Sequence, residues 1–463
     1  MPRKAGDMIK MGLFYWPGGH HIAGWRHPEA ETDGVHNFRR IAELARTCER
    51  GKFHFFFLAD LIGIWPRDLP AQSRATRAAY FEPLTLIGAL SAVTEKIGFV
   101  ATASTTYNEP YHIARKFASL DNINGGRTGW NLVTSHAAAE AANFSRDQHA
   151  AHGDRYVRAR EFAEVVMGLW DSWEDGAILE DKEQGRYFDP DKLHFLNHVG
   201  PNFQVRGPLN VPRSPQGRPI IVQAGSSNDG RDLAAATADV IFAATNKIED
   251  GQAFHADIKA RTHAKGRNPD HIAVMPGIFP IIGGTEAEAQ RKYEELQALV
   301  EPEIGLFLLS HLLGTDVSGF NPDKPLPDLP ENSGAKGRRE VIMGMARREG
   351  LTLRELYLKV AVARGHNLVI GTPEQVADVM ERWFLEHACD GFNLLPPTFP
   401  TGLDDFVDGV VPILQQRGLY RTDYVEGTLR DNLGLPYPEN RLASAREYHA
   451  ADRIDVRREA YTG

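Results

Sequence analysis

The sequence predicts an α/β fold in which eight parallel strands close into a (β/α)8 TIM barrel with insertions and a C-terminal arm. Short runs rich in β-branched and aromatic residues alternate with longer segments of helical periodicity, which is the pattern of βα units. Eight such runs occur, the number that closes a barrel. They predict strands at residues 9–15, 53–58, 97–103, 129–133, 219–223, 240–243, 272–282 and 391–395.

The segments between these runs predict the helices that cover a barrel. One further helix has clear start signals in GTPEQVADVMERWF: Thr372 as N-cap, Pro373 at the first helical position and Gln375 completing a capping box. This helix leads into the eighth strand. The other helices are expected near residues 34–50, 82–95, 110–123, 154–173, 228–237, 249–265, 285–300 and 404–418.

The whole chain, residues 1–463, is interpreted as a single barrel domain. Two stretches, about 174–218 and about 301–368, do not fit regular βα units and are expected to be insertions in loops. The segment from about 419 to 463 is predicted to be an extended arm. Because such arms often pack on a second subunit, we expect a homodimer or homotetramer.

Composition excludes several classes of protein. The formal charge of −9 comes without a long basic run, so a nucleic-acid partner is not expected. No apolar run approaches the ~20 residues of a membrane span or resembles a signal peptide. Cys48 and Cys389 fall in helical stretches and imply no disulfide framework. We expect a cytoplasmic protein that acts on small molecules.

Polar residues lie at or near the C-terminal ends of four successive predicted strands, where barrel enzymes place their active sites. For any one of these residues, capping of a loop or helix is an equally good explanation. Together they predict a polar rim at the C-terminal ends of the strands. Its members are Asp60, Thr102, Ser104, Asn131, Thr134, Ser135, His136, Gly225, Ser226 and Ser227.

The segment QAGSSNDGRDLAAATA places a Gly-Ser turn directly before a helix, where backbone N–H groups and the helix dipole attract an anion. A phosphate could bind there, although a simple turn with an N-cap explains the same residues. Barrel phosphate sites more often follow strands seven and eight, whereas this turn follows strand five. The turn therefore does not identify a ligand by itself.

No metal site is expected. His20, His21 and His27 cluster after the first strand, but the adjacent His20 and His21 would point to opposite sides of a strand end. His136 and His152 are better placed as neutral hydrogen-bonding groups, or as ordinary loop histidines. The sequence also lacks a nucleophile elbow, a Walker loop and a GxGxxG motif. This combination indicates that a bound cofactor supplies the chemistry.

Several long motifs carry a family resemblance. GGRTGWNLVTSHAAAEAANF, followed by HGDRY, resembles the FMN-dependent monooxygenases related to nitrilotriacetate monooxygenase component A and dibenzothiophene sulfone monooxygenase, in the bacterial luciferase-like superfamily. HIAGWRHPEA, GKFHFFFLAD, GPLNVPRSPQGRPIIVQAGSS and DGFNLLPP are similar to the same group. The motifs extend over nearly the whole chain.

The resemblance implies roles for individual residues. Asp60 and Thr102 correspond to residues at the flavin ring, and His152 with Tyr156 to the pair near the phosphate. Ser226 and Ser227 correspond to the phosphate turn, although relatives often have a larger apolar residue at the first position, so Ser226 would contribute mainly its backbone. Beside the reactive face, the resemblance implies catalytic roles for Asn131, His136, His21 and His311.

The resemblance also implies an activity. Reduced FMN would come from a separate NAD(P)H-dependent flavin reductase, and the chain would use it with O2 to oxygenate a small organic substrate of the aminopolycarboxylate, organosulfur or alkane type. A deazaflavin-dependent hydride-transfer enzyme on the same barrel is an alternative, and so is a flavin-binding protein without turnover. A metal-dependent barrel hydrolase is a third alternative.

The sequence leaves the substrate open. Several carboxylates would require charge-assisted partners, and the arginines near the first two strand ends are candidates. Aromatic residues nearby could equally line an apolar pocket or simply pack in loops. The candidates for binding carboxylates are Arg26, Arg67, Arg74 and Arg77. The candidates for lining an apolar pocket are Phe14, Trp16 and Trp65.

Overall fold

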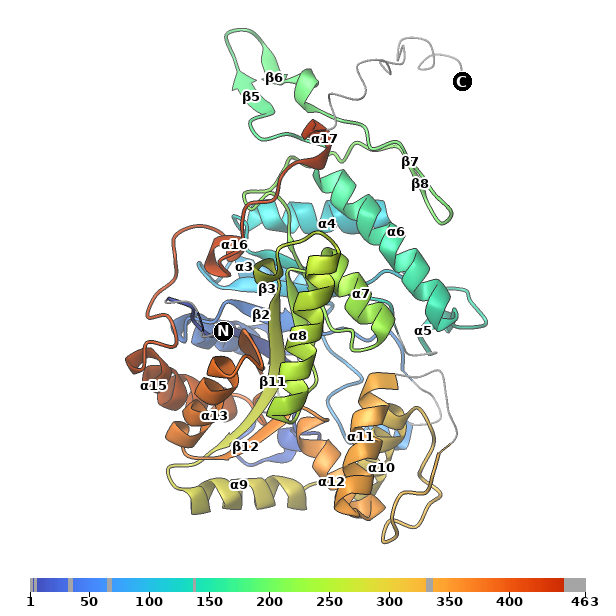
Figure 1. Ribbon diagram of the computed structural model, residues 1–463, viewed down its shortest axis with the longest axis vertical. Coiled ribbons are helices and arrows are strands. Elements are labelled where there is room, and N and C mark those ends of the chain that lie inside the picture. The colour runs from blue at the N-terminus through green and yellow to red at the C-terminus, as the bar shows by residue number, and fades with distance from the viewer. Residues whose placement is uncertain are drawn as a thin grey trace.

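The computed structural model describes residue 3 and residues 6–31, 36–64, 69–135, 139–329 and 336–444. Within these residues, eight parallel strands form a closed ring in the order β1–β2–β3–β4–β9–β10–β11–β13, with β13 paired to β1. Figure 1 shows part of this sheet, with β2, β3 and β11 among the helices that surround it. The predicted barrel is confirmed. The strands are β1 Lys10–Tyr15, β2 Phe55–Leu58, β3 Gly98–Ser104, β4 Thr128–Val133, β9 Ile220–Gln223, β10 Val240–Ala243, β11 Ala273–Ile282 and β13 Gly391–Leu394.

A further parallel strand, β12 (Asn367–Gly371), was not predicted from the sequence. The long strand β11 accommodates it: Ala273–Pro276 pairs with β10, whereas Ile278–Ile282 pairs with β12. The short apolar run Leu368–Ile370, a few residues after the end of a helix, does not by itself distinguish a strand from the end of an insertion. The pairing with β11 decides the assignment.

The predicted helices that cover the barrel are confirmed. They include the helix α13 (Pro373–Leu385), where Thr372 Oγ1 accepts from the Gln375 N–H and Gln375 Oε1 accepts from the Thr372 N–H. Their bounds are α1 Phe38–Arg50, α3 Pro83–Ser91, α4 Pro110–Ile123, α6 His152–Trp170, α7 Asn228–Thr237, α8 Ile248–Ala264 and α9 Glu286–Ala298. After β13 come α14 Thr401–Asp405, the π-helical turn η6 Phe406–Val410 and α15 Val411–Gln416.

The two irregular stretches have different structures. Between α6 and β9, the chain forms two small antiparallel ladders that extend away from the barrel at the top of Figure 1. They are β5 Ile178–Asp181 with β6 Arg186–Phe188, and β7 His198–Val199 with β8 Gln204–Val205. Between α9 and β12, the helices α10 (Pro302–Leu313), α11 (Lys336–Glu349) and α12 (Leu353–Ala363) pack around buried Leu309, Ile342 and Leu356.

The start of the C-terminal arm packs on the barrel of its own chain. In the short helix α16 (Leu429–Asn432), Leu429 is buried and joins Leu433 and Leu435 against the side chains inside the barrel. A Cβ at Gly98 would lie 2.7 Å from Leu429, so this strand start needs glycine. The helix α17 (Arg441–Ser444) follows. Residues 445–463 of the predicted arm lie outside the described residues.

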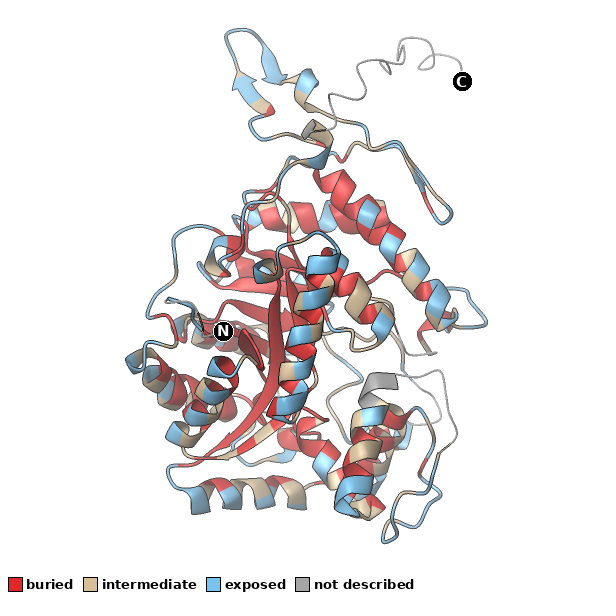
Figure 2. Ribbon diagram, viewed as in Figure 1, coloured by how far each residue is buried: buried red, intermediate tan, exposed pale blue. Residues whose placement is uncertain are grey.

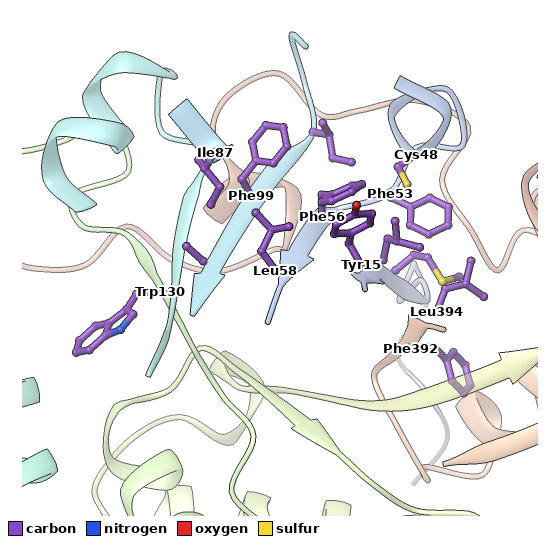
Figure 3. Close-up of a cluster of buried hydrophobic side chains, with 14 of the residues drawn as sticks. Tyr15, Cys48, Phe53, Phe56, Leu58, Ile87, Phe99, Trp130, Phe392 and Leu394 are labelled. Atoms are coloured by element: carbon purple, nitrogen blue, oxygen red, sulfur yellow. The ribbon is translucent and has the colours of Figure 1, made fainter. Parts of the chain in front are cut away.

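Side-chain alternation along the strands separates two cores. In β2, Phe55 and Phe57 belong to the cluster inside the barrel, whereas Phe56 and Leu58 belong to the core between strands and helices. Figure 3 shows this outer core, with Phe56 near Tyr15 and Phe99. The strands are buried on both faces (Figure 2), as expected for a parallel sheet covered by helices.

Within the described ranges, no single helix is long and apolar enough to cross a membrane. The helices α9 and α10 reach that length and composition only together, and they meet at an angle of 91°.

Candidate active site at the C-terminal ends of the strands

A cavity of about 1640 Å³ opens at the C-terminal ends of the barrel strands. Residues directly after β2, β4, β9 and β10 form its walls, and α10, α11 and α12 contribute further side chains. A drug-sized ligand fills a pocket of roughly 300–1,000 Å³. The cavity is therefore large enough for a nucleotide cofactor together with a second small molecule.

Most of the predicted site residues line this one cavity. They come from segments far apart in the sequence, and the barrel brings them together because parallel strands end on the same side. His136 lies outside the described residues, so its role stays a prediction. The lining residues among those predicted are Asp60, Thr102, Asn131, His152, Tyr156, Ser226, Ser227 and His311.

Asn131 presents an oriented acceptor to the cavity. Thr102 Oγ1 donates to the Leu58 carbonyl at 2.8 Å and therefore accepts from Asn131 Nδ2, also at 2.8 Å. This chain of bonds sets the orientation of the amide. Asn131 Oδ1 is left buried with no hydrogen-bond partner among the described residues. A buried unsatisfied acceptor is costly, so the site is prepared for a donor from a ligand.

The Gly-Ser turn has the shape of an anion cradle. Ser227 is the N-cap of α7, and its side chain accepts from the Gly230 N–H at 3.2 Å. A Cβ at Gly225 would lie 2.8 Å from the Gly230 Cα atom, and a Cβ at Gly230 would lie 3.1 Å from the Tyr156 hydroxyl. The glycines therefore allow the turn, the first turn of α7 and the start of α6 to meet closely. Anions bind well at such helix starts.

His152 and Tyr156 lie one turn apart at the start of α6, with ring centroids 4.8 Å apart. His152 Nε2 lies 3.4 Å from a carboxylate oxygen of Asp229, which belongs to the first turn of α7. The two helix starts therefore converge on the Gly-Ser turn. The structure brings the predicted phosphate-side residues together at one end of the cavity.

The surroundings of Asp60 disfavour the ionised form of its carboxyl group. Burial raises its pKa from the ordinary value of 3.8 to about 7, and the negative charges of Glu82 and Glu140 act in the same direction. Hydrogen bonds from Leu61 and Tyr80 oppose the shift only partly. Near neutral pH the protonation of Asp60 therefore responds to whatever binds beside it.

The structure places His21 away from the cavity wall. Its ring is fully buried, with Nε2 3.4 Å from Gln297 Oε1 and Nδ1 accepting from the Ala23 N–H. Burial lowers the pKa of His21 to about 4, which keeps the ring neutral. The adjacent His20 lines the cavity instead, with Nε2 2.8 Å from the Phe14 carbonyl oxygen. His311 lines the cavity from α10, with its ring beside that of Phe307.

Part of the aromatic wall was not predicted from the sequence. Phe14, at the end of β1, forms edge contacts with Phe57 and Phe242, whose ring centroids lie 5.0 and 5.3 Å away. Phe242 in turn stacks on His366 at 5.1 Å. Phe14 was a candidate, but Phe242 and His366 lie in segments whose pattern indicated only a strand and an insertion. Inward alternation in the strand at 240–243 was the available signal for Phe242.

These features fit a flavin mononucleotide. Flat aromatic side chains suit an isoalloxazine ring, Asn131 Oδ1 can accept its N–H, and the turn at Ser226 and Ser227 can hold its phosphate. Within the described ranges, no three His, Cys, Asp or Glu side chains are arranged to hold a metal ion.

The fold and the cavity define a (β/α)8 protein with a site at its strand ends that fits a flavin mononucleotide. Comparison with known families identifies it further, because residues 19–386 match the model described as luciferase-like monooxygenase. The chain belongs to this family. Two relatives that are 52% identical to it are named monooxygenases, and the chain is a flavin-dependent monooxygenase.

Two similar proteins extend over nearly the full chain. Nitrilotriacetate monooxygenase component A of Aminobacter aminovorans is 52% identical over 448 residues, with 95% of this chain and 99% of the relative covered. N-acetyl-S-(2-succino)cysteine monooxygenase of Bacillus subtilis (strain 168) is 52% identical over 438 residues, covering 94% of this chain and 98% of the relative. The family resemblance seen in the motifs is confirmed.

A solved structure shows a flavin in the same fold. Riboflavin lyase RcaE, crystallised with modified FMN and its substrate riboflavin, superposes with a TM-score of 0.83 at 34% identity. The superposition covers 93% of this chain and 97% of that protein. The substrates named for these three relatives differ widely, so family membership leaves the substrate of this chain open.

Proposed function

We propose that the chain is the oxygenase component of a two-component system. A separate NAD(P)H-dependent flavin reductase delivers reduced FMN, and the chain uses it with O2 to oxygenate a small organic substrate. The Aminobacter relative is named as component A of a monooxygenase, which supports a second protein component such as this reductase. The observation that carries the proposal is the unsatisfied Asn131 Oδ1 in the cavity that also holds the Gly-Ser turn.

In this proposal one group of residues binds the phosphate of the cofactor and another group binds its ring. The turn at Ser226 and Ser227, with Tyr156 and His152, binds the phosphate. Asn131, held by Thr102, binds the ring. When bound, reduced flavin supplies the electrons that activate oxygen. The protein supplies orientation and exclusion of water, to which Phe14 and Phe242 contribute apolar surface.

The inserted helices form part of the wall of this site. Side chains of α10 and α12 line the cavity, among them Phe307, His311 and Val362. A reactive flavin must be protected from water until substrate arrives, and inserted segments commonly serve this purpose in enzymes. In this proposal the inserted helices limit the access of water to the bound flavin.

The test combines purified protein with FMN, NADH, a generic flavin reductase and ¹⁸O2. Candidate polycarboxylates, organosulfur compounds and alkanes are supplied, and products are detected by mass spectrometry. Incorporation of one ¹⁸O atom into a product supports the proposal. Formation of hydrogen peroxide alone, across the whole panel, would favour a flavin-binding protein without turnover. The absorbance spectrum of the cofactor extracted from purified protein separates FMN from a deazaflavin.

A further inference from the structure

Two arginine side chains meet on the cavity wall beside the loop after β1. Arg77 Nη2 donates to the His20 carbonyl at 3.2 Å, and Arg364 Nη2 donates to the same carbonyl at 3.4 Å. Both residues line the cavity. They come from distant parts of the chain, Arg77 from the segment before α3 and Arg364 from the C-cap of α12. The fold therefore holds two positive charges against one backbone oxygen.

Within the described part of the chain, neither guanidinium forms an ion pair with a carboxylate. Arg364 Nε is buried and has no hydrogen-bond partner there. Burial lowers the pKa of Arg364 to about 9, and no neighbouring carboxylate offsets that effect. Arg77 lies 4.8 Å from the centroid of the Trp16 ring, a contact that leaves donors of its guanidinium available. Two like charges placed together at a cavity surface favour an anion between them.

The other arginine candidates behave differently. Arg74 pairs with Glu301 and lies 2.9 Å from Glu303, and Arg26 pairs with Glu301 at 3.1 Å. Both arginines therefore already form ion pairs with carboxylates, and their side chains are about one-third or more exposed. Arg67 lies outside the described residues. The structure thus selects Arg77 from the candidates and adds Arg364, which the sequence analysis placed in an insertion.

The ring of strands separates this pair from the predicted phosphate end. In the order β1–β2–β3–β4–β9–β10–β11–β13, β9 lies directly across the barrel from β1. The Gly-Ser turn follows β9, whereas His20, which binds both arginines, follows β1. A phosphate at the turn therefore leaves the arginine pair facing the remaining volume of the cavity.

We propose that Arg77 and Arg364 form a carboxylate-binding subsite, so that the substrate is a small molecule with at least one, and preferably two, carboxylate groups. This inference rests on the proposed function, because it assigns the arginine end of the cavity to the substrate. Paired guanidinium groups bind carboxylates by charge-assisted hydrogen bonds, often bidentate. An uncharged alkane would offer neither guanidinium group a counter-ion.

The test measures binding to the FMN-loaded protein by calorimetry. The probes are succinate, citrate and nitrilotriacetate, each compared with its neutral ethyl ester. We expect at least one anion to bind at least tenfold more tightly than its ester. Arg77→Gln and Arg364→Gln are each expected to weaken that binding tenfold or more. Arg74→Gln is the matched control, since it removes an equal charge nearby and is expected to leave binding unchanged.

Three outcomes would overturn the inference. The first is that no anion binds more tightly than its ester. The second is that Arg74→Gln weakens binding as much as the other two variants. The third is that Arg77→Gln or Arg364→Gln weakens FMN binding but not riboflavin binding, which would assign the pair to the cofactor phosphate.

Failure of the proposed function is detected separately, because wild-type protein would then form no ¹⁸O-labelled product from any compound of the panel, whether or not it binds FMN and an anion. Thermal unfolding distinguishes a loss of anion binding from a loss of folding in the variants. If the pair serves an anion, the anion raises the Tm of wild type and of Arg74→Gln, but not that of the two other variants. A purely structural role would instead lower the Tm of both variants without any anion and leave their response to it intact.

Discussion

Substitution of Asp60 by asparagine tests the environment of the cavity through stability alone. The pKa of this carboxyl is about 7 in the folded protein and 3.8 when exposed. Between these values the folded state holds a proton that the unfolded state has lost, so the free energy of unfolding falls as pH rises from about 4 to 7. A shift of this size corresponds to about 4 kcal/mol, at 1.36 kcal/mol for each pH unit.

The Asp60→Asn variant carries an uncharged amide at this position and therefore avoids the loss. Urea unfolding of the cofactor-free protein at pH 4 and pH 8 measures the effect. We expect Asp60→Asn to match wild type at pH 4 and to exceed it by up to about 4 kcal/mol at pH 8. Glu82→Gln should reduce the loss in wild type without removing it, because Glu82 contributes to the shift. Equal differences between wild type and Asp60→Asn at both pH values would refute the reasoning.

Three further predictions concern the cofactor and the barrel. Asn131→Ala removes the free acceptor and is expected to weaken FMN binding about three- to tenfold in a fluorescence titration, with poorer coupling of NADH use to product; unchanged affinity and coupling would remove this residue from the site. Ser227→Ala removes the N-cap of α7 and should cost about 1 kcal/mol of stability, and it should weaken FMN binding more than riboflavin binding; an equal effect on both ligands would argue against a phosphate there. Leu429→Ala leaves a cavity among the side chains inside the barrel and should cost about 2–5 kcal/mol in urea unfolding, with FMN affinity retained; a loss below about 1 kcal/mol would contradict the packing.

Much of the site could be predicted because, in a barrel, the residues at the C-terminal ends of all the strands lie on the same face. Asp60, Thr102 and Asn131 lie in or just after the last part of predicted strands. Because parallel strands end on one side of a barrel, we could predict that these residues meet. The Gly-Ser turn was visible for the same reason. His21 lies outside this argument, because its catalytic role was implied only by the family resemblance. In the loop after β1 the neighbouring His20 lines the cavity, whereas His21 contacts Gln297.

What the sequence by itself determined is the ring of eight strands, the helices around it and the residues at the strand ends, since these depend on local periodicity and on capping groups such as Thr372. The tertiary structure alone decided the rest. It paired β12 with the second half of β11, placed Leu429 inside the barrel and brought Arg77 and Arg364 to one carbonyl. These outcomes depend on contacts between segments up to several hundred residues apart, and no local pattern encodes which distant partner a side chain meets.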